Sequence, residues 1–160
     1  MDITVNNNII LKPIDKENAT LLFPLFRADL KEISQWFPFD EGYQLAYDLS
    51  YVEEKQPPYD ETFVIYYQGE SCGRIGLYDY TGDKKEIYLY YWVASPYRRK
   101  HIALDSVSAV IEYLKTIGIE SVLFDVKREN TSSISLISHL PNAGIINDDP
   151  DMLLYRCSIQ

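Results

Sequence analysis

Apolar residues recur along the chain with two different periods, and the change of period separates predicted helices from predicted strands. In the first third, apolar positions lie three or four residues apart, which predicts helices over residues 22–36 and over Glu41–Lys55. Pro24 falls in the first of these helices, and we expect it in a first turn or at a kink because proline lacks an N–H. Pro57 and Pro58 end the second helix.

The middle of the chain is rich in β-branched and aromatic residues, which favours extended structure. We predict strands over 62–67, 72–80 and 86–93, with a short glycine-containing turn after each of the first two. Consecutive strands joined by such turns form an antiparallel meander. Residues 3–14 predict an earlier strand or a short hairpin.

Helix and strand alternate in the last third. A continuous apolar stripe predicts a helix over 102–117, with Gly118 as its C-cap. A buried strand over 119–126, a short helix over 130–139 and a final strand over 152–159 follow. The predicted order is β-α-α-β-β-β-α-β-α-β. This order indicates a mixed α/β (α+β) sheet rather than a doubly wound parallel one.

Composition narrows the class of protein. With 46% hydrophobic and 24% charged residues, residues 1–160 are expected to fold as one domain. The 15 basic and 24 acidic residues give a net charge of −9, which argues against broad nucleic-acid binding. The sequence has neither a membrane-length apolar run nor a recognisable secretory signal, so we expect a cytoplasmic protein. Cys72 and Cys157 show no metal-ligand spacing; we expect no metal and two buried, inert thiols.

Four consecutive residues with basic side chains precede the 102–117 helix: Arg98, Arg99, Lys100 and His101. Cations at a helix N-terminus are unfavourable by about 0.3–1 kcal/mol each. A strand, a short loop and a helix N-terminus together also form a common anion site, because the first helical N–H groups lack partners. A bound phosphate would resolve the charge conflict; the alternative is a basic turn that points into solvent.

The segment Tyr91–Ala103, together with the element order, resembles the GCN5-related N-acetyltransferases. The nearest branch is the one that includes the ribosomal-protein N-terminal acetyltransferases. Two further features are similar to this branch: the pattern Asn130-x-x-Ser133 after the 119–126 strand, and the opening strand Ile9–Ile14. The resemblance covers nearly the whole chain, and it implies a mostly antiparallel central sheet flanked by helices.

The resemblance also implies a cosubstrate, acetyl-CoA, and direct transfer of its acetyl group to a primary amine. The amine would belong to a small molecule or to a peptide N-terminus, and the acidic chain favours a cationic acceptor. The pantetheine arm would pair with the end of the 86–93 strand, and the pyrophosphate would lie on the loop that follows. The implied cofactor-binding residues are Val93, Ala94, Arg98, Arg99, Lys100, His101, Ile102, Ala103, Asn130 and Ser133.

Several family members carry a general base on the third strand of the meander, which makes Glu86 the candidate base here. The alternative for Glu86 is a strand-end carboxylate in solvent. Tyr88 and Tyr90 share a face with Glu86 because strand side chains alternate. Together with Trp36, in the loop after the first helix, they form the candidate acceptor pocket; packing in the core is the alternative for all three.

Three residues depart from the family pattern. Arg99 and His101 stand where glycines are common, and Ile137 stands where many members have a tyrosine that protonates the leaving thiolate. Helical backbone angles, which any residue adopts, would leave the N–H groups of the loop accessible. The departures keep two alternatives open: a catalytically weak or inactive protein that binds CoA, and an interaction domain with a tyrosine-rich surface. A monomer and a homodimer both fit.

Overall fold

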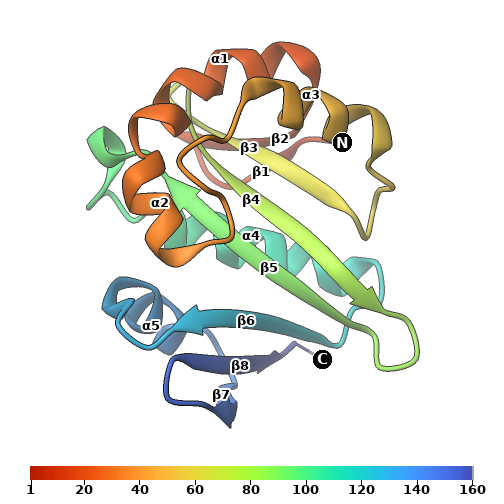
Figure 1. Cartoon of the computed structure of the whole chain (residues 1–160). Helices are drawn as coiled ribbons and strands as arrows, with labels where there is room; N and C mark the ends of the chain where they lie inside the picture. Colours follow the sequence, from red (N-terminus) through yellow and green to blue (C-terminus); the bar gives the residue numbers. More distant parts are fainter. Residues whose placement is uncertain (160) are drawn as a thin grey trace.

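The computed structural model describes residues 1–159, whose strands form one eight-stranded sheet in the order β1-β2-β3-β4-β5-β6-β8-β7 (Figure 1). Within these residues every neighbouring pair is antiparallel except β5 and β6, so the predicted mixed, mostly antiparallel sheet is confirmed. The strands are β1 (Ile3–Thr4), β2 (Ile9–Pro13), β3 (Glu61–Tyr67), β4 (Glu70–Thr81), β5 (Glu86–Val93), β6 (Ser121–Lys127), β7 (Ala143–Asp148) and β8 (Met152–Ser158).

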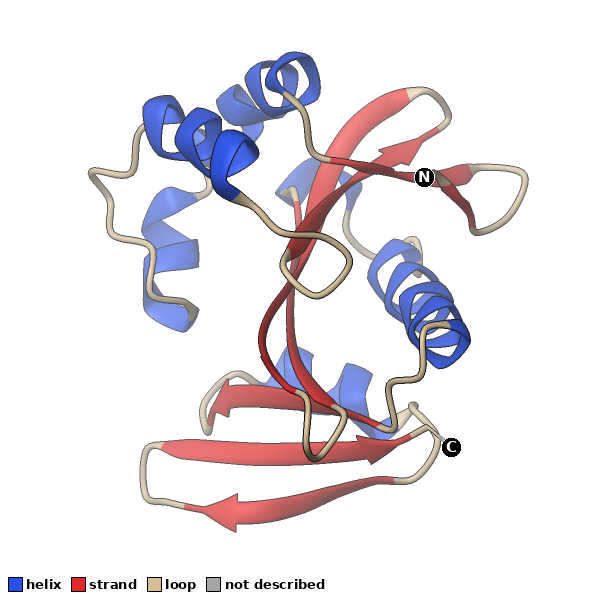
Figure 2. Cartoon of the chain, turned by 90° about the vertical axis from the view of Figure 1, so that its right-hand side faces the viewer, coloured by secondary structure: helices blue, strands red, loops and turns tan. Residues whose placement is uncertain are grey.

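Helices cover both faces of the sheet (Figure 2). One face carries α1 (Lys16–Ala28), α2 (Leu30–Trp36) and α3 (Leu45–Glu54), and the other carries α4 (Ile102–Thr116) and α5 (Thr131–Ser138). Each face has its own hydrophobic cluster, because alternate residues of the strands point to opposite sides. None of the helices in residues 1–159 is both long and apolar enough to cross a bilayer.

The predicted helix over 22–36 is in fact two helices. Its first half begins earlier, at Lys16, because Asp15 and Asn18 form a reciprocal capping box with N···O distances of 2.7 and 2.8 Å. The helical path breaks at Asp29, whose carboxylate bonds to the end of β5 and the loop that follows instead. Pro24 lies inside α1 rather than in its first turn.

The sequence analysis missed β7. All but the first of its residues are exposed, so the strand shows no alternation of apolar and polar positions for periodicity to detect. It pairs with β8 alone, through a hairpin whose turn contains the acidic segment 148–151. The helix predicted from Glu41 starts at Leu45, and the strand predicted from residue 119 starts at Ser121.

The parallel pair β5–β6 is short, and this feature creates the site. The strands are in register only from Glu86 opposite Ser121 to Tyr88 opposite Leu123. Beyond these residues β5 continues to Val93 and β6 to Lys127, and the two strands diverge (Figure 1). The sheet therefore opens into a wedge between β5 and β6, with the N-terminus of α5 beside it.

Candidate active site in the opening between β5 and β6

Two cavities meet in the opening. The larger, of about 720 Å³, is lined by α2, the end of β5, the loop before α4 and the first turn of α5. The smaller, of about 370 Å³, lies between aromatic side chains on one side and β6 on the other. Five of the lining residues are shared by the two cavities and mark the place where they join: Trp36, Phe37, Tyr91, Asn130 and Ser133.

The end of β5 presents to the larger cavity main-chain groups that do not pair with β4. The Ala94 N–H donates to the Cys72 carbonyl of β4 at 2.8 Å. Because hydrogen-bonding directions alternate along a strand, Tyr91 and Val93 direct their main-chain groups away from β4 and into the opening. These residues lie beyond the stretch that pairs with β6. The strand end can therefore hydrogen-bond to an extended ligand, as one more strand would.

Two residues of the loop before α4 adopt positive φ angles, which are usual for glycine, although neither is a glycine. Arg99 has φ of 64° and His101 has φ of 60°. Both values lie in the left-handed region, where a residue with a Cβ costs roughly 1–2 kcal/mol. The expectation of helical angles in this loop is therefore wrong at both positions. At both positions glycine would adopt the same angles without this cost.

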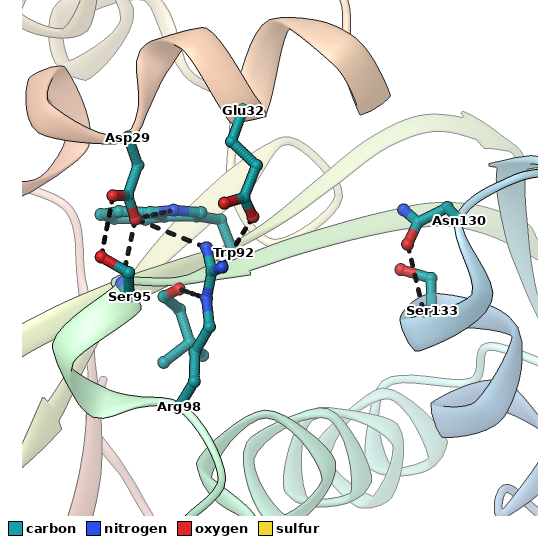
Figure 3. A network of polar contacts seen from close by, with 8 residues as sticks. Asp29, Glu32, Trp92, Ser95, Arg98, Asn130 and Ser133 are labelled. Atoms are coloured by element: carbon teal, nitrogen blue, oxygen red, sulfur yellow. Dashed lines mark hydrogen bonds and ion pairs between the residues drawn. The ribbon is translucent and has the colours of Figure 1, made fainter.

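The Arg98 side chain is tied back to α2 rather than left free for an anion (Figure 3). Its guanidinium pairs with Glu32 at 2.7 Å and with Asp29 at 3.5 Å, and its Nε donates to the Val93 carbonyl at 3.1 Å. Asp29 also accepts from Trp92 Nε1 at 3.1 Å. The charge of Arg98 is thus balanced by two carboxylates, and the network fixes α2 against the end of β5.

The structure brings together six of the predicted cofactor-binding residues around the larger cavity: Val93, Arg98, Arg99, Ala103, Asn130 and Ser133. The other four line neither cavity. Ala94 and Ile102 are buried in the core, whereas Lys100 and His101 are exposed on the loop. Among the ion pairs of residues 1–159 none involves Arg99, so its charge is available to a ligand of the larger cavity.

Hydroxyl groups stand at the junction of the two cavities. Asn130 caps α5 by accepting from the Ser133 N–H at 3.3 Å (Figure 3). The Tyr91 hydroxyl donates to Ser133 Oγ at 2.9 Å. Burial raises the pKa of Tyr91, which keeps its phenol protonated at neutral pH. The pair can therefore supply a proton to a group that becomes negative at the junction.

The predicted acceptor pocket is brought together in part. Trp36 and Tyr90 line the smaller cavity, but Tyr88 does not. Tyr88 instead packs against Tyr78, with ring centroids 5.4 Å apart. Phe37 and Phe39, which follow Trp36 in the same aromatic segment, also line this cavity. Its other aromatic residues are Tyr78, Tyr91 and Phe124.

Glu86 lies at the far end of β5, away from the opening. Its carboxylate accepts from Arg156 Nε at 2.7 Å, and the residue is only 7% exposed. It lines neither cavity, so the structure does not bring it to the other candidate residues. The alternative of a solvent-exposed carboxylate is also wrong, because Glu86 is buried and paired.

Asp125 lines the smaller cavity and was missed by the sequence analysis. Burial and the charge of Asp149 raise the pKa of Asp125. The available signal was its place as the one charged residue in the apolar run Val122–Val126 of the predicted buried strand. Periodicity shows which face a residue occupies, but it does not show that the strand borders an opening.

Comparison with known proteins agrees with this geometry. Residues 8–140 match the family model described as an acetyltransferase (GNAT) domain. No curated protein sequence gives a significant match. Among solved structures, RimL ribosomal L7/L12 alpha-N-protein acetyltransferase in complex with coenzyme A is 18% identical, with a TM-score of 0.88 over 99% of this chain and 98% of that one.

Two further solved structures have similar folds. The microcin C7 self-immunity acetyltransferase MccE, in complex with acetyl-CoA and AMP, is 18% identical, with a TM-score of 0.81 over 97% of this chain and 94% of that one. RimJ from Mycobacterium smegmatis, in complex with CoA-disulfide, is 20% identical, with a TM-score of 0.78 over 94% and 81%. Because the family model covers most of the sequence, the chain belongs to the GNAT acetyltransferase family.

Proposed function

We propose that this protein transfers the acetyl group of acetyl-CoA directly to a primary amine. The observation that carries the proposal is the meeting of two cavities of different character in the opening between β5 and β6. The larger cavity has main-chain groups and an arginine outside any ion pair for CoA, and the smaller is mostly aromatic and apolar and suits the acceptor. Membership of the GNAT family supports the reaction class, and structures of similar fold contain CoA or acetyl-CoA.

The larger cavity fits the parts of CoA. Amides of the pantetheine arm would hydrogen-bond to the main chain of Tyr91 and to the Val93 N–H, as the direction of these groups allows. The Val93 carbonyl is already held by Arg98 Nε. The pyrophosphate would lie at the N-terminus of α4, where unpaired N–H groups and the positive end of the helix dipole favour an anion. Arg99 would add a charged contact. Arg98 would position the loop through α2 rather than bind phosphate itself.

Transfer takes place at the junction of the cavities. The amine, after losing one proton to water, attacks the thioester carbonyl carbon, and the C–S bond breaks. The nitrogen then releases its second proton as it becomes the amide, and the CoA thiolate takes up a proton, so the donor that protonates the thiolate is restored. Ile137 lines the smaller cavity at the position where the family resemblance places a tyrosine, and its hydrocarbon side chain has no proton to donate. The hydrogen-bonded pair Tyr91 and Ser133 takes that role in our proposal. The rest of the rate acceleration comes from holding the amine and the thioester close together in the correct orientation.

Thermal melting with acetyl-CoA tests the binding half of the proposal. A ligand at about 100 times its dissociation constant adds roughly 2.7 kcal/mol of stability, which raises the melting midpoint by roughly 5–10 °C for a domain of this size. The substitution Arg99→Glu should remove most of the rise. Lys84→Glu, with the same charge change in the β4–β5 turn, should not. The absence of a rise in the unmodified protein would exclude CoA from the opening and favour the interaction-domain alternative.

Release of free CoA thiol in the presence of an amine panel tests the transfer half. Ser133→Ala should lower the rate at saturating substrates by roughly 100-fold while leaving the acetyl-CoA melting shift in place. Ser135→Ala, an exposed serine of the same helix, is the matched control and should retain the full rate. Binding of CoA without turnover on a broad panel would instead support the inactive, CoA-binding alternative.

A further inference from the structure

The smaller cavity is an aromatic chamber built from two sides. Phe37 and Phe39 come from the segment after α2, and Tyr90 comes from β5. The ring centroids of Phe37 and Phe39 lie 6.0 and 5.7 Å from that of Tyr90, and Tyr78 lies 6.1 Å from it. Rings at these distances hold one another in place. A cavity of about 370 Å³ has the size of a small-molecule site.

This chamber contains a single group that is ionised at neutral pH. Among its lining residues only Asp125 has an acidic or basic side chain, and the others are apolar or carry neutral amide and hydroxyl groups. Asp125 lies on β6, on the face opposite the buried Phe124, and therefore on the same face as Leu123. Leu123 is level with Tyr88 of β5, so Asp125 projects on the side of the sheet that carries Tyr90, Phe37 and Phe39.

Asp125 lines the chamber and is also exposed to solvent, and its carboxylate has no cation of its own. Arg128 is engaged by Asp148, and Arg156 is engaged by Glu86. Across the part of the chain that the structure describes, none of the ion pairs includes Asp125. Burial and nearby negative charge raise the pKa of Asp125, and a bound cation would reverse this effect.

We infer that Asp125 receives the ammonium end of the acceptor while the aromatic wall holds an apolar or aromatic body. The substrate class is thus a small monoamine with such a body. This inference rests on the proposed function, because it assigns the second substrate of that reaction. The aromatic faces add attraction for one cation. A second positive charge held inside the chamber, as in a polyamine bound along its length, would lie against apolar surface without a second carboxylate, which is costly.

Acetylation rates with defined amines test the substrate class. We expect kcat/KM to be at least tenfold higher for 2-phenylethylamine than for spermidine. It should also be at least tenfold higher than kcat/KM for a peptide with a free N-terminus. Asp125→Asn should lower kcat/KM for 2-phenylethylamine by at least tenfold through KM, without altering the KM for acetyl-CoA. Asp151→Asn, which makes the same charge change outside both cavities, should have no effect. Faster reaction of spermidine or of the peptide would overturn the inference.

Binding in the absence of acetyl-CoA separates this inference from the transfer reaction. In calorimetry, Asp125→Asn should raise the dissociation constant of 2-phenylethylamine at least tenfold. The same substitution should leave the dissociation constant of the uncharged analogue 2-phenylethanol unchanged. Equal losses for both compounds would mean that the residue shapes the chamber and does not recognise charge. Failure of the proposed function appears differently, as no acetyl-CoA melting shift alongside normal amine binding.

Discussion

Single residues in the loop before α4 carry backbone strain that glycine would avoid. His101, at the N-cap of α4, has φ of 60° and ψ of 16°, and Arg99 has φ of 64°. The N-cap side chain makes no capping hydrogen bond, so nothing local offsets the left-handed conformation of His101. The loop keeps its path because the elements on either side, β5 and α4, are packed in the core.

Replacement of His101 by glycine should stabilise the protein. Glycine removes the left-handed penalty but loses more chain entropy on folding, so we expect a net gain of about 0.5–1 kcal/mol in the free energy of unfolding. Urea denaturation measures it. His101→Ala keeps the Cβ and should show no gain, and equal stability of the glycine and alanine variants would contradict the strain argument.

The two cysteines should be unreactive in the folded protein. Burial raises the pKa of the Cys72 thiol to about 12, and the Cys157 thiol, whose pKa is also raised by burial, donates to the Pro141 carbonyl at 2.9 Å. The thiolate is the reactive form, and at pH 8 a raised pKa leaves little of it. We expect no labelling by a thiol reagent in native buffer and two labels in urea, as counted by mass spectrometry.

At the scale of elements, a buried ion pair fastens α3 to the sheet. Arg74 on β4 makes two parallel bonds to the Asp48 carboxylate, at 3.1 and 2.9 Å, and both side chains are at most 3% exposed. Tyr43 donates to the same carboxylate at 2.6 Å, and the Phe26 ring lies 4.1 Å from the Arg74 guanidinium carbon. Tyr43 and Phe26 are in turn packed with Phe39, which lines the smaller cavity.

Removal of one partner of this pair should be strongly destabilising. Asp48→Ala leaves the Arg74 charge buried without compensation, and we expect a loss of about 3–5 kcal/mol. Glu53→Ala on the same helix breaks the exposed pair with Lys16, whose side chains are about two-thirds exposed, and should cost less than about 1 kcal/mol. Chemical denaturation compares the two. Similar losses would show that the Asp48 pair does not hold the helix.

At the scale of the whole molecule, the site exists because the sheet is made of two parts that separate. Strands β1 to β5 form one part, and β6, β8 and β7 form the other, joined by three residues of parallel pairing. In each part the strand at the boundary, β5 or β6, continues past the paired residues. Each of these two strands therefore supplies one wall of the smaller cavity. A ligand in the opening bridges both parts, which links its binding to the stability of the whole fold.

Hydrogen exchange should report this bridging. With saturating CoA, the amides of Tyr91 and Val93, which face the opening, should exchange at least tenfold more slowly because they gain hydrogen-bond partners. The amide of Ile87, within the stretch that pairs with β6, is the internal reference and should change less. Greater slowing at Ile87 than at Tyr91 would place CoA elsewhere.

The sequence by itself determined the elements whose signals are local. Periods of two and of three to four residues predicted the meander and α4, and the chain order predicted a mixed sheet. The basic loop and the Asn130-x-x-Ser133 pattern marked two segments that line the larger cavity, because a loop and a helix cap are short-range features. These features predict a fold and a family, since each depends on residues a few positions apart.

Only the tertiary structure decided how these elements serve the site. The divergence of β5 from β6, the pairing of Glu86 with Arg156 and the position of Asp125 in the smaller cavity depend on segments that are distant in the chain. The ties of Arg98 to α2 are of the same kind. Periodicity reports which face of an element is buried, but it carries no information about which distant residue lies opposite. That choice is made by packing and charge pairing in the folded chain.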